Sequence, residues 1–375
     1  MSKAGPLNPP AGAVASTGKT IAEAEPRTAV NATNTPGGGS YTFRITQPGS
    51  YYLTGNIQTG GLTGGIEITA SGVTLDLNGF TIDGGYAGGP GSPIYGVHIN
   101  GTRSNVLITN GHVINCPGYG IAVSSSLSSS IVLRNLTVAN AGIVTIDATC
   151  PGVRMSGCTV QGVAGGAGLG VQLGAGAVVE ECVLRGLGNA GLVAQDGSTI
   201  TDCTVAACTG AGFNVFGGST VSRCTSLGNG GSGFVIGNAC TVTGCTARSN
   251  TGSGFSAASG CTLHLCSADS NGAAGIAAVD HNLIDTCIAT ANGAAGISVR
   301  QGNTVRGNHS NAHSAAGAAG ILLTSFTPGG NRVEGNNCEF NTRGYWRRAR
   351  GTSSSATRRW GTPPIGRSPG ATTCR

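Results

Sequence analysis

The side chains that could do chemistry recur at a fixed interval along this sequence. A cysteine returns every 21 residues, at Cys182, Cys203, Cys224, Cys245, Cys266 and Cys287. Fourteen cysteines in one chain could form disulfides or bind a metal, because thiolates do both. This set, however, places one cysteine in each interval, with no Cys-x-x-Cys pair and no clustered histidine. We therefore expect buried free thiols that fill a core, and we expect no metal and no cofactor at them.

A second group of residues has the types needed for proton transfer. His264, Asp285 and Arg306 are also spaced 21 residues apart, and Asp280 precedes His281 in an expected turn. A histidine beside an aspartate can act as a general acid or base, so these five residues are the catalytic candidates. A surface ladder of opposite charges explains the same pattern, and we favour that interpretation.

A repeat of the whole chain must position all of these residues. A glycine followed by a hydrophobic residue returns every 21 residues at Gly170, Gly191, Gly212, Gly233, Gly254, Gly275 and Gly296, and then after 24 at Gly320 and Gly344. Between these glycines the apolar residues alternate over short runs, without the spacing of a helix. Three short strands joined by tight turns use about one such interval. The sequence thus predicts an all-β, single-stranded parallel β-helix of about 12 coils, mostly of 21–24 residues each.

Adding 21 lines up the columns that would stack in such a fold. Two columns predicted to face inward are Ile200, Val221, Val242, Leu263, Ile284, Val305 and Leu192, Phe213, Phe234, Phe255, Ile276, Ile297. Asparagines align at Asn229, Asn250, Asn271 and Asn292. Asparagine tolerates left-handed turns, and its amide can bond to the coils above and below, so we expect a structural ladder. Stacked thiols have parallel side-chain directions, which suit disulfides poorly.

Charge and hydropathy limit the partners. The chain carries a net charge of +6, but residues 1–342 hold 13 Lys and Arg against 15 Asp and Glu, and the last 33 residues hold eight arginines and no acid. The repeat body therefore offers no basic stripe for a nucleic acid. No run of 18 apolar residues predicts a membrane span.

The pattern divides the chain into three parts. Residues 1–40 form an extended lead-in rich in Pro, Gly and Ala, which lacks the features of a secretory signal. Residues 41–343 form the β-helix, with a cap region at 41–64 and regular repeats at 170–343. Residues 344–375 abandon the repeat for Arg, Gly, Pro and Ser. Two interpretations of this tail stay open, a disordered basic segment and the product of a reading-frame change, and we favour the second.

These features resemble a known superfamily. The glycine-led repeat, the two ladders, the run SGVTLDLNGFTIDG and the segment EPRTAVNATNTPGG followed by YTFRITQPGSYYLTGNI are similar to the right-handed parallel β-helix proteins that include pectin and pectate lyases. The similarity extends over about residues 23–343, and its opening resembles bacterial members without an assigned activity. It implies a right-handed solenoid and an extracellular or cell-envelope location. Because the superfamily contains enzymes, adhesins and inert stalks, it implies no single function.

The enzymes of this superfamily place their catalytic groups on one exposed sheet face. Those similar to pectate lyases bind Ca²⁺ through several carboxylates, and those similar to polygalacturonases cluster aspartates with a histidine. The outward column expected here is Gln172, Val193, Asn214, Val235, Ser256, Ala277, Ser298 and Leu322. This column has no carboxylate, whereas a Ca²⁺ site or a glycosidase pair needs at least two acids. Ca²⁺ is therefore implied only if the protein is a lyase.

We therefore expect a non-catalytic scaffold that contacts polysaccharide or protein at a surface or outside the cell. A carbohydrate-active enzyme, either a polysaccharide lyase or a glycoside hydrolase, is the first alternative. An ice-binding protein is the second, because threonines recur at Thr199/Thr201, Thr220/Ser222 and Thr241/Thr243. Threonine is also a favoured strand residue, which explains the array without ice.

Overall fold

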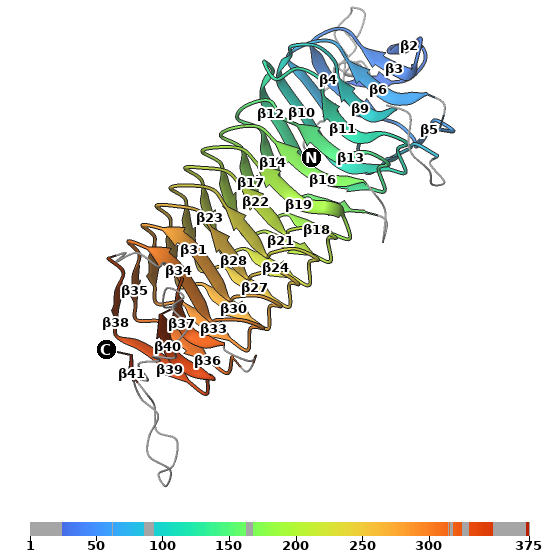
Figure 1. The fold of residues 1–375 in the computed structure, drawn as a ribbon. Coiled ribbons are helices and arrows are strands. Elements are labelled where there is room, and N and C mark those ends of the chain that lie inside the picture. The colour runs from blue at the N-terminus through green and yellow to red at the C-terminus, as the bar shows by residue number, and fades with distance from the viewer. Residues whose placement is uncertain are drawn as a thin grey trace, which may run out of the picture.

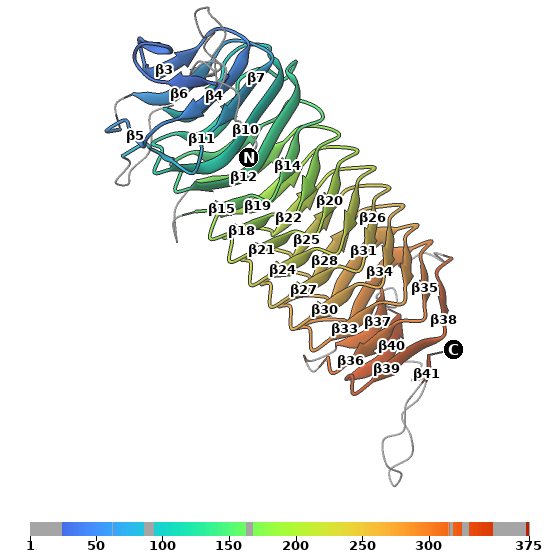
Figure 2. The ribbon, with the colours of Figure 1, turned by 180° about the vertical axis from the view of Figure 1, so that it is seen from behind.

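The computed structural model describes residues 25–61, 63–85, 94–162, 168–313, 315, 318–324, 330–347 and 373–374. These residues form a long rod of stacked β-coils, which Figures 1 and 2 show from opposite sides. The chain winds through about 13 turns, and the described residues contain strands but no helix. The predicted all-β parallel β-helix is thus confirmed.

Each regular coil holds three short strands, as predicted. In one coil these are β19 (Gly188–Ala194), β20 (Thr199–Thr201) and β21 (Thr204–Ala206). Each strand pairs in parallel with the matching strand of the next coil. Each residue thereby lies beside the residue 21 positions later, as Ile200 lies beside Val221. Side chains spaced by 21 therefore stack directly in columns along the rod.

One face of the rod is a 15-stranded sheet, here called the front sheet. Its strands are β2 (Pro36–Gly38), β3 (Tyr41–Ile45), β6 (Gly64–Ile68), β9 (Tyr95–Ile99), β11 (Tyr119–Val123), β13 (Val144–Ala148), β16 (Leu169–Leu173), β19, β22 (Phe213–Val215), β25 (Phe234–Ile236), β28 (Phe255–Ala257), β31 (Ile276–Asp280), β34 (Ile297–Gln301), β37 (Ala319–Leu323) and β40 (Arg343–Arg347).

The other two strands of each coil join a 26-stranded sheet that bends around the rod. The first strand of each pair belongs to the row β1 (Thr28–Val30), β4 (Gly49–Leu53), β7 (Val73–Asp76), β10 (Ser104–Ile114), β12 (Ser129–Ala139), β14 (Arg154–Ser156), β17 (Val178–Glu180), β20, β23 (Thr220–Ser222), β26 (Thr241–Thr243), β29 (Thr262–His264), β32 (Leu283–Asp285), β35 (Thr304–Arg306) and β38 (Arg332–Glu334). The second belongs to β5 (Ile57–Gln58), β8 (Thr81–Asp83), β15 (Thr159–Gln161), β18 (Val183–Arg185), β21, β24 (Thr225–Leu227), β27 (Thr246–Arg248), β30 (Ser267–Asp269), β33 (Ile288–Thr290), β36 (His309–Asn311), β39 (Asn336–Glu339) and β41 (Thr373–Cys374). The long strands β10 and β12 run through both rows and join them.

The predicted inward columns form the core. All twelve of their side chains have 0% exposure. The rings of Phe213, Phe234 and Phe255 stack with centroids 4.7 and 4.8 Å apart and almost parallel planes. The apolar side chains are thus buried from water in continuous rows. This burial is the main stabilising contribution in a solenoid.

The corner between the second and third strands of a coil explains the cysteine spacing. Asp202 lies at this corner with a φ of 54°, a left-handed conformation that turns the chain sharply. The next residue, Cys203, points inward and donates its thiol proton to the carbonyl oxygen of Thr201, at 3.1 Å. The thirteen cysteines from Cys116 to Cys338 are buried and free of disulfides. The prediction of buried free thiols is confirmed for these thirteen.

The asparagine ladder is also confirmed. The Asn250 side-chain oxygen accepts hydrogen bonds from the backbone N–H and the amide of Asn229, at 3.1 and 2.9 Å. The sequence analysis expected the asparagine itself to be left-handed, and this detail is wrong. The left-handed residue is the one before it, such as Ser249 with a φ of 54°. Further ladders run through Asn282, Asn303 and the partly exposed Asn331, and through the buried Asn308 and Asn336.

The recurrent glycines allow a close approach between coils. A Cβ atom on Gly233 would lie 2.7 Å from the carbonyl oxygen of Gly254 and 2.9 Å from the amide nitrogen of Asn250. Alanine at this position would collide with both groups. The glycine repeat and the asparagine ladder therefore depend on each other.

Additional strands cover the ends of the two sheets. At the N-terminal end β1 pairs with β4, and β2 forms an antiparallel pair with β3, so β-structure begins at Thr28, inside the segment expected as a lead-in. At the other end β40 continues the front sheet to Arg347, and β41 pairs antiparallel with β39. The remainder of the predicted tail, residues 348–372, lies outside the described residues, so its nature stays a prediction.

Candidate functional site

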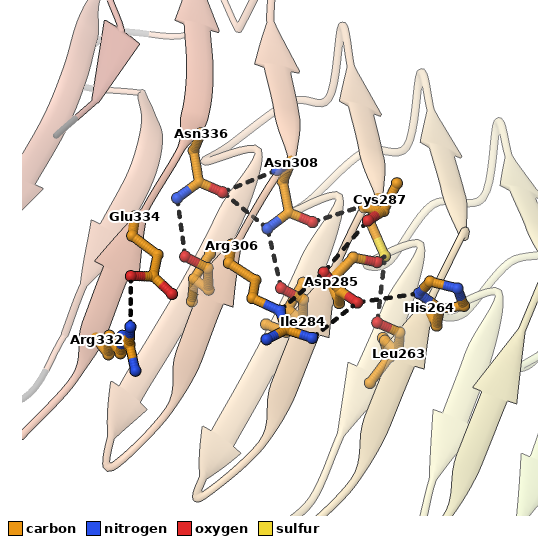
Figure 3. Close-up of polar contacts among 12 residues, drawn as sticks. Leu263, His264, Ile284, Asp285, Cys287, Arg306, Asn308, Arg332, Glu334 and Asn336 are labelled. Carbon is orange, nitrogen blue, oxygen red and sulfur yellow. Dashed lines mark hydrogen bonds and ion pairs between the residues drawn. The ribbon is translucent and has the colours of Figure 1, made fainter.

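The structure brings three of the five predicted catalytic residues together. His264, Asp285 and Arg306 pair in register on β29, β32 and β35 (Figure 3). The Asp285 carboxylate lies 3.3 Å from Nδ1 of His264 and accepts a hydrogen bond of 3.1 Å from Nε of Arg306. The Arg306 guanidinium lowers the pKa of Asp285, which keeps this carboxylate ionised. The arrangement is a charged column on the surface, and its catalytic role stays an untested prediction.

The other two predicted residues lie apart from this column. Asp280 ends β31 in the front sheet and pairs with Arg300, whose Nε donates to it at 2.7 Å. This guanidinium lowers the pKa of Asp280. His281 occupies the adjoining corner with a φ of 57°. Asp280 is therefore engaged in its own ion pair.

The outward column of the front sheet is the uncharged surface that the sequence predicts. We call it the track, and it consists of Gln172, Val193, Asn214, Val235, Ser256, Ala277, Ser298 and Leu322, which pair in register. All eight side chains are partly exposed. Polar and apolar residues alternate from one coil to the next along the track.

Toward the N-terminus the same column carries chemistry that the sequence analysis missed. Ahead of Gln172 it continues through Asp147, Ala122, His98, Glu67 and Arg44. The coils in this part differ in length, so adding 21 could not reach them. The signal was nevertheless present, because a glycine and an aliphatic residue precede Glu67, His98 and Ala122, as they precede Gln172.

Aromatic rings stack beside this part of the column, and we call the assembly the tyrosine cluster: Tyr41, Arg44, Glu67, Tyr95, His98, Tyr119 and Asp147. The Tyr95 ring lies 4.1 Å from the His98 ring, with planes 9° apart, and 5.1 Å from the Tyr119 ring. The Tyr41 hydroxyl is hydrogen-bonded to Nδ1 of His98. The Tyr41 ring reaches this place by crossing Gly64, where a Cβ atom would lie 2.5 Å from it.

Glu67 is a buried charge whose partners are all present. Its side chain is ion-paired with Nε of Arg44 and accepts a 2.8 Å hydrogen bond from the Asn100 amide. Glu67 itself is only 3% exposed. A buried carboxylate without partners would be strongly destabilising, so Arg44 and Asn100 are committed to it.

Two other groups of the tyrosine cluster lack a partner. Nε2 of His98 and Oδ1 of Asp147 are buried atoms without a hydrogen bond. Burial lowers the pKa of His98, against the opposite effect of Glu67, and burial raises the pKa of Asp147. The imidazole is thus favoured in its neutral form and the carboxyl in its protonated form.

The described residues contain no group of three or more His, Cys, Asp or Glu that could hold a metal ion. They also contain no helix long and apolar enough to cross a membrane.

Comparison with known families agrees with this geometry. The model of the right-handed β-helix region matches residues 141–283 and 237–338, together more than half of the chain. The protein belongs to the right-handed β-helix family. No curated protein sequence matches this β-helix protein.

Solved structures similar to this β-helix protein have diverse roles. The Dettilon tailspike protein is 15% identical with a TM-score of 0.50, and the match covers 69% of this chain and 60% of the tailspike. The mannuronan C-5 epimerase AlgE4 A-module of Azotobacter vinelandii is 14% identical with a TM-score of 0.48, covering 81% and 91%. Pectate lyase Pel9A is 13% identical with a TM-score of 0.38, covering 82% and 71%. At such identities the likeness extends to the fold alone.

Proposed function

We propose that this β-helix protein binds glycans, and that an extended polysaccharide lies along the track. The composition of the track carries the proposal, because none of its eight in-register side chains is charged. Its amides and hydroxyls, at Gln172, Asn214, Ser256 and Ser298, can each donate to and accept from sugar hydroxyls. The apolar residues between them suit the C–H faces of sugar rings.

The geometry of the track suits a polymer better than a globular partner. Its side chains repeat at the strand spacing of about 4.8 Å, so a chain of similar units meets the same surface in successive coils. Polar and apolar positions alternate, which matches a polysaccharide whose successive rings alternate in orientation. A protein partner would favour a compact cluster of large anchors, whereas the apolar residues of the track are separated by polar ones.

The charge of the surface favours neutral glycans. An acidic polysaccharide loses hydration on binding and needs a cation in return. The track holds no cation, and Arg44, at the end of the same column, is ion-paired with Glu67. We therefore assign the ligand to the uncharged glycans.

A glycan array followed by affinity electrophoresis tests this function. The full-length chain is run in gels that contain xylan, mannan or soluble cellulose derivatives, with pectate and alginate as acidic controls. Ser256→Arg places a long charged side chain on the track, and the matched variant Ser267→Arg places the same side chain on β30 of the other sheet. We expect retardation by a neutral glycan that Ser256→Arg abolishes and Ser267→Arg preserves. Equal retardation of both variants, or binding of acidic glycans only, would contradict the proposal.

A further inference from the structure

His98 and Asp147 face the same side of the front sheet with one small residue between them. His98 pairs in register with Ala122, and Ala122 pairs with Asp147. Two strand spacings, about 9.5 Å, therefore separate the Cα atoms of His98 and Asp147. Because side chains in register point the same way, only the methyl group of Ala122 lies between the imidazole and the carboxyl group along the column.

Each of these two residues has one buried polar atom without a hydrogen bond. His98 is 6% exposed, and its Nε2 has no hydrogen-bond partner; the same holds for the buried Oδ1 of Asp147. Buried polar atoms are nearly always hydrogen-bonded, and exceptions require an explanation such as a catalytic role. Two exceptions in one column point to partners that the described chain does not itself supply.

The surroundings favour opposite protonation states for the two groups. Burial favours the neutral imidazole of His98 and the protonated carboxyl of Asp147. The charged groups close to His98 are Glu67 and Arg44, which pair with each other, and the neighbouring hydroxyl belongs to Tyr41. A pair of titratable groups shifted in opposite directions is the pattern of a catalytic acid and base.

We propose that Asp147 and His98 are the acid and the base of a glycosidic-bond hydrolysis that inverts the anomeric carbon. This proposal rests on glycan binding along the track, which continues into the pair at Gln172. Asp147 gives its proton to the glycosidic oxygen as the bond from that oxygen to the anomeric carbon breaks. A water molecule attacks the carbon from the opposite side, and Nε2 of His98 takes its proton. Water is the only co-reactant, and each product ends in a hydroxyl group.

The hydrogen bond of His98 to Tyr41 is compatible with this role. Nε2 can accept a proton only when the ring proton resides on Nδ1, which then donates to the Tyr41 hydroxyl oxygen. The Tyr95 ring, stacked 4.1 Å from His98, covers the imidazole and must turn away when a sugar enters. Tyr41 therefore acts as a positioning residue.

Hydrolysis fits the column better than elimination. In inverting glycosidases the two catalytic carboxyl groups stand about 6.5–9.5 Å apart, which leaves room for water. Two strand spacings put the Cα atoms of His98 and Asp147 about 9.5 Å apart, and side chains in register that point the same way are compatible with such a separation. Elimination from a uronic acid needs a cation to neutralise the sugar carboxylate. The basic residue of this column, Arg44, is committed to Glu67.

The test uses the full-length chain with xylan, mannan and soluble cellulose derivatives and measures reducing ends, unsaturated products and the anomer released. We expect reducing ends of inverted configuration and no unsaturated product. The rate should fall when the pH is lowered, because His98 becomes protonated, and when it is raised, because Asp147 ionises. Asp147→Asn and His98→Gln should each lower the rate at least about 100-fold, with glycan retardation in gels preserved.

Surface variants of the same types control for the substitutions. Asp202→Asn and His112→Gln should leave the rate unchanged. Ala122→Leu keeps the imidazole and the carboxyl group but fills the space between them, so it should abolish hydrolysis. This variant tests the pair independently if a variant of His98 or Asp147 misfolds. Retardation by a glycan without reducing ends, unsaturated products, or full activity of Asp147→Asn would overturn the hydrolysis and leave glycan binding standing. Absence of both retardation and products would overturn both.

Discussion

His313 takes the place of an asparagine within a ladder that continues to Asn341, whose side-chain oxygen accepts the backbone N–H of His313 at 3.1 Å. It lies 21 residues after Asn292, and its Nδ1 accepts the backbone N–H of Asn292 at 3.1 Å. Its Nε2 lies 3.2 Å from the Ser310 hydroxyl, which donates to the carbonyl oxygen of Gly320 at 2.6 Å. Because Nδ1 must accept, Nε2 carries the proton and the ring is neutral. Burial accordingly lowers the pKa of His313.

This arrangement predicts a loss of stability in acid. The unfolded chain binds a proton at His313 below a pH of about 6.5, whereas the folded chain binds it only at lower pH. The contribution of His313 to the free energy of unfolding should therefore be constant above that pH. It should decrease as the pH falls toward the lowered pKa of His313 in the folded state. His313→Asn restores the ladder residue and should remove this part of the decrease in urea unfolding between pH 7 and 5. An identical pH dependence in both proteins would contradict the assignment.

Gly64 is the residue on which the tyrosine cluster depends. Gly64→Ala places a methyl group 2.5 Å from the Tyr41 ring, so the ring must leave His98. We expect a loss of about 1–3 kcal/mol in unfolding free energy, as for other overpacked sites. Gly55→Ala is the control, because nothing lies within 4 Å of its added Cβ. Chemical denaturation compares them, and equal stability would show that the ring accommodates the methyl group.

At the scale of the coil, the asparagine ladder hydrogen-bonds each coil to the next at the turn before the front sheet. Asn250 satisfies the backbone N–H of Asn229 and donates to the carbonyl oxygen of Ser226, at 3.1 and 3.2 Å. The corner residues before each asparagine are left-handed, and the glycine of the next strand leaves space for the amide. The ladder thus stabilises the turn that returns the chain to the front sheet.

Removing one member of the ladder should be costly. Asn250→Ala leaves the buried backbone N–H of Asn229 without its acceptor and removes the amide that donates to the carbonyl oxygen of Ser226. The Asn271 side-chain oxygen keeps the backbone N–H of residue 250. We expect about 1–3 kcal/mol of destabilisation, mainly from the unsatisfied N–H of Asn229. Asn214→Ala removes a partly exposed amide on the track and should change stability by less than about 0.5 kcal/mol. Thermal and urea unfolding measure the stability of both variants. A similar small effect at both positions would show that the ladder contributes little to stability.

The regular coils were predictable from the sequence, and the irregular coils were not. Constant spacing made the columns of Phe213, Asn250 and Cys203 readable by addition, since in-register pairing converts a period into contact. The tyrosine cluster lies where the coils vary in length, so no single period connects His98 with Asp147. Their protonation preferences depend on burial, which a spacing pattern does not reveal.

At the scale of the whole molecule, the core of the described coils is closed to solvent. Thirteen described cysteines lie inside it, and hydrogen bonding from the neighbouring Cys182 thiol, together with burial, raises the pKa of Cys203 to about 12. Hydrogen bonding from Cys261 instead lowers the pKa of Cys240 to about 7, so burial, and not protonation, is what the thirteen thiols share, and a thiol that a reagent cannot reach does not react. The stacked thiols therefore act as core residues of the β-helix.

This closure predicts the result of thiol titration. In the native protein, the thirteen buried cysteines should not react with a thiol reagent at neutral pH. After denaturation without a reductant, at least 13 thiols per chain should react. A denatured count near zero would mean that disulfides have formed and would refute the free-thiol core.

The central claim is that the outer face of the front sheet is the glycan surface of this β-helix protein. The position of a neutral oligosaccharide in a crystal of the full-length chain tests it most directly. We predict sugar rings over the track from Gln172 to Ser298, lying along the rod axis, with the end of the chain toward His98 and Asp147. An oligosaccharide seated instead on the charged column of His264, Asp285 and Arg306, or across the threonine strands β20 and β23, would contradict the account.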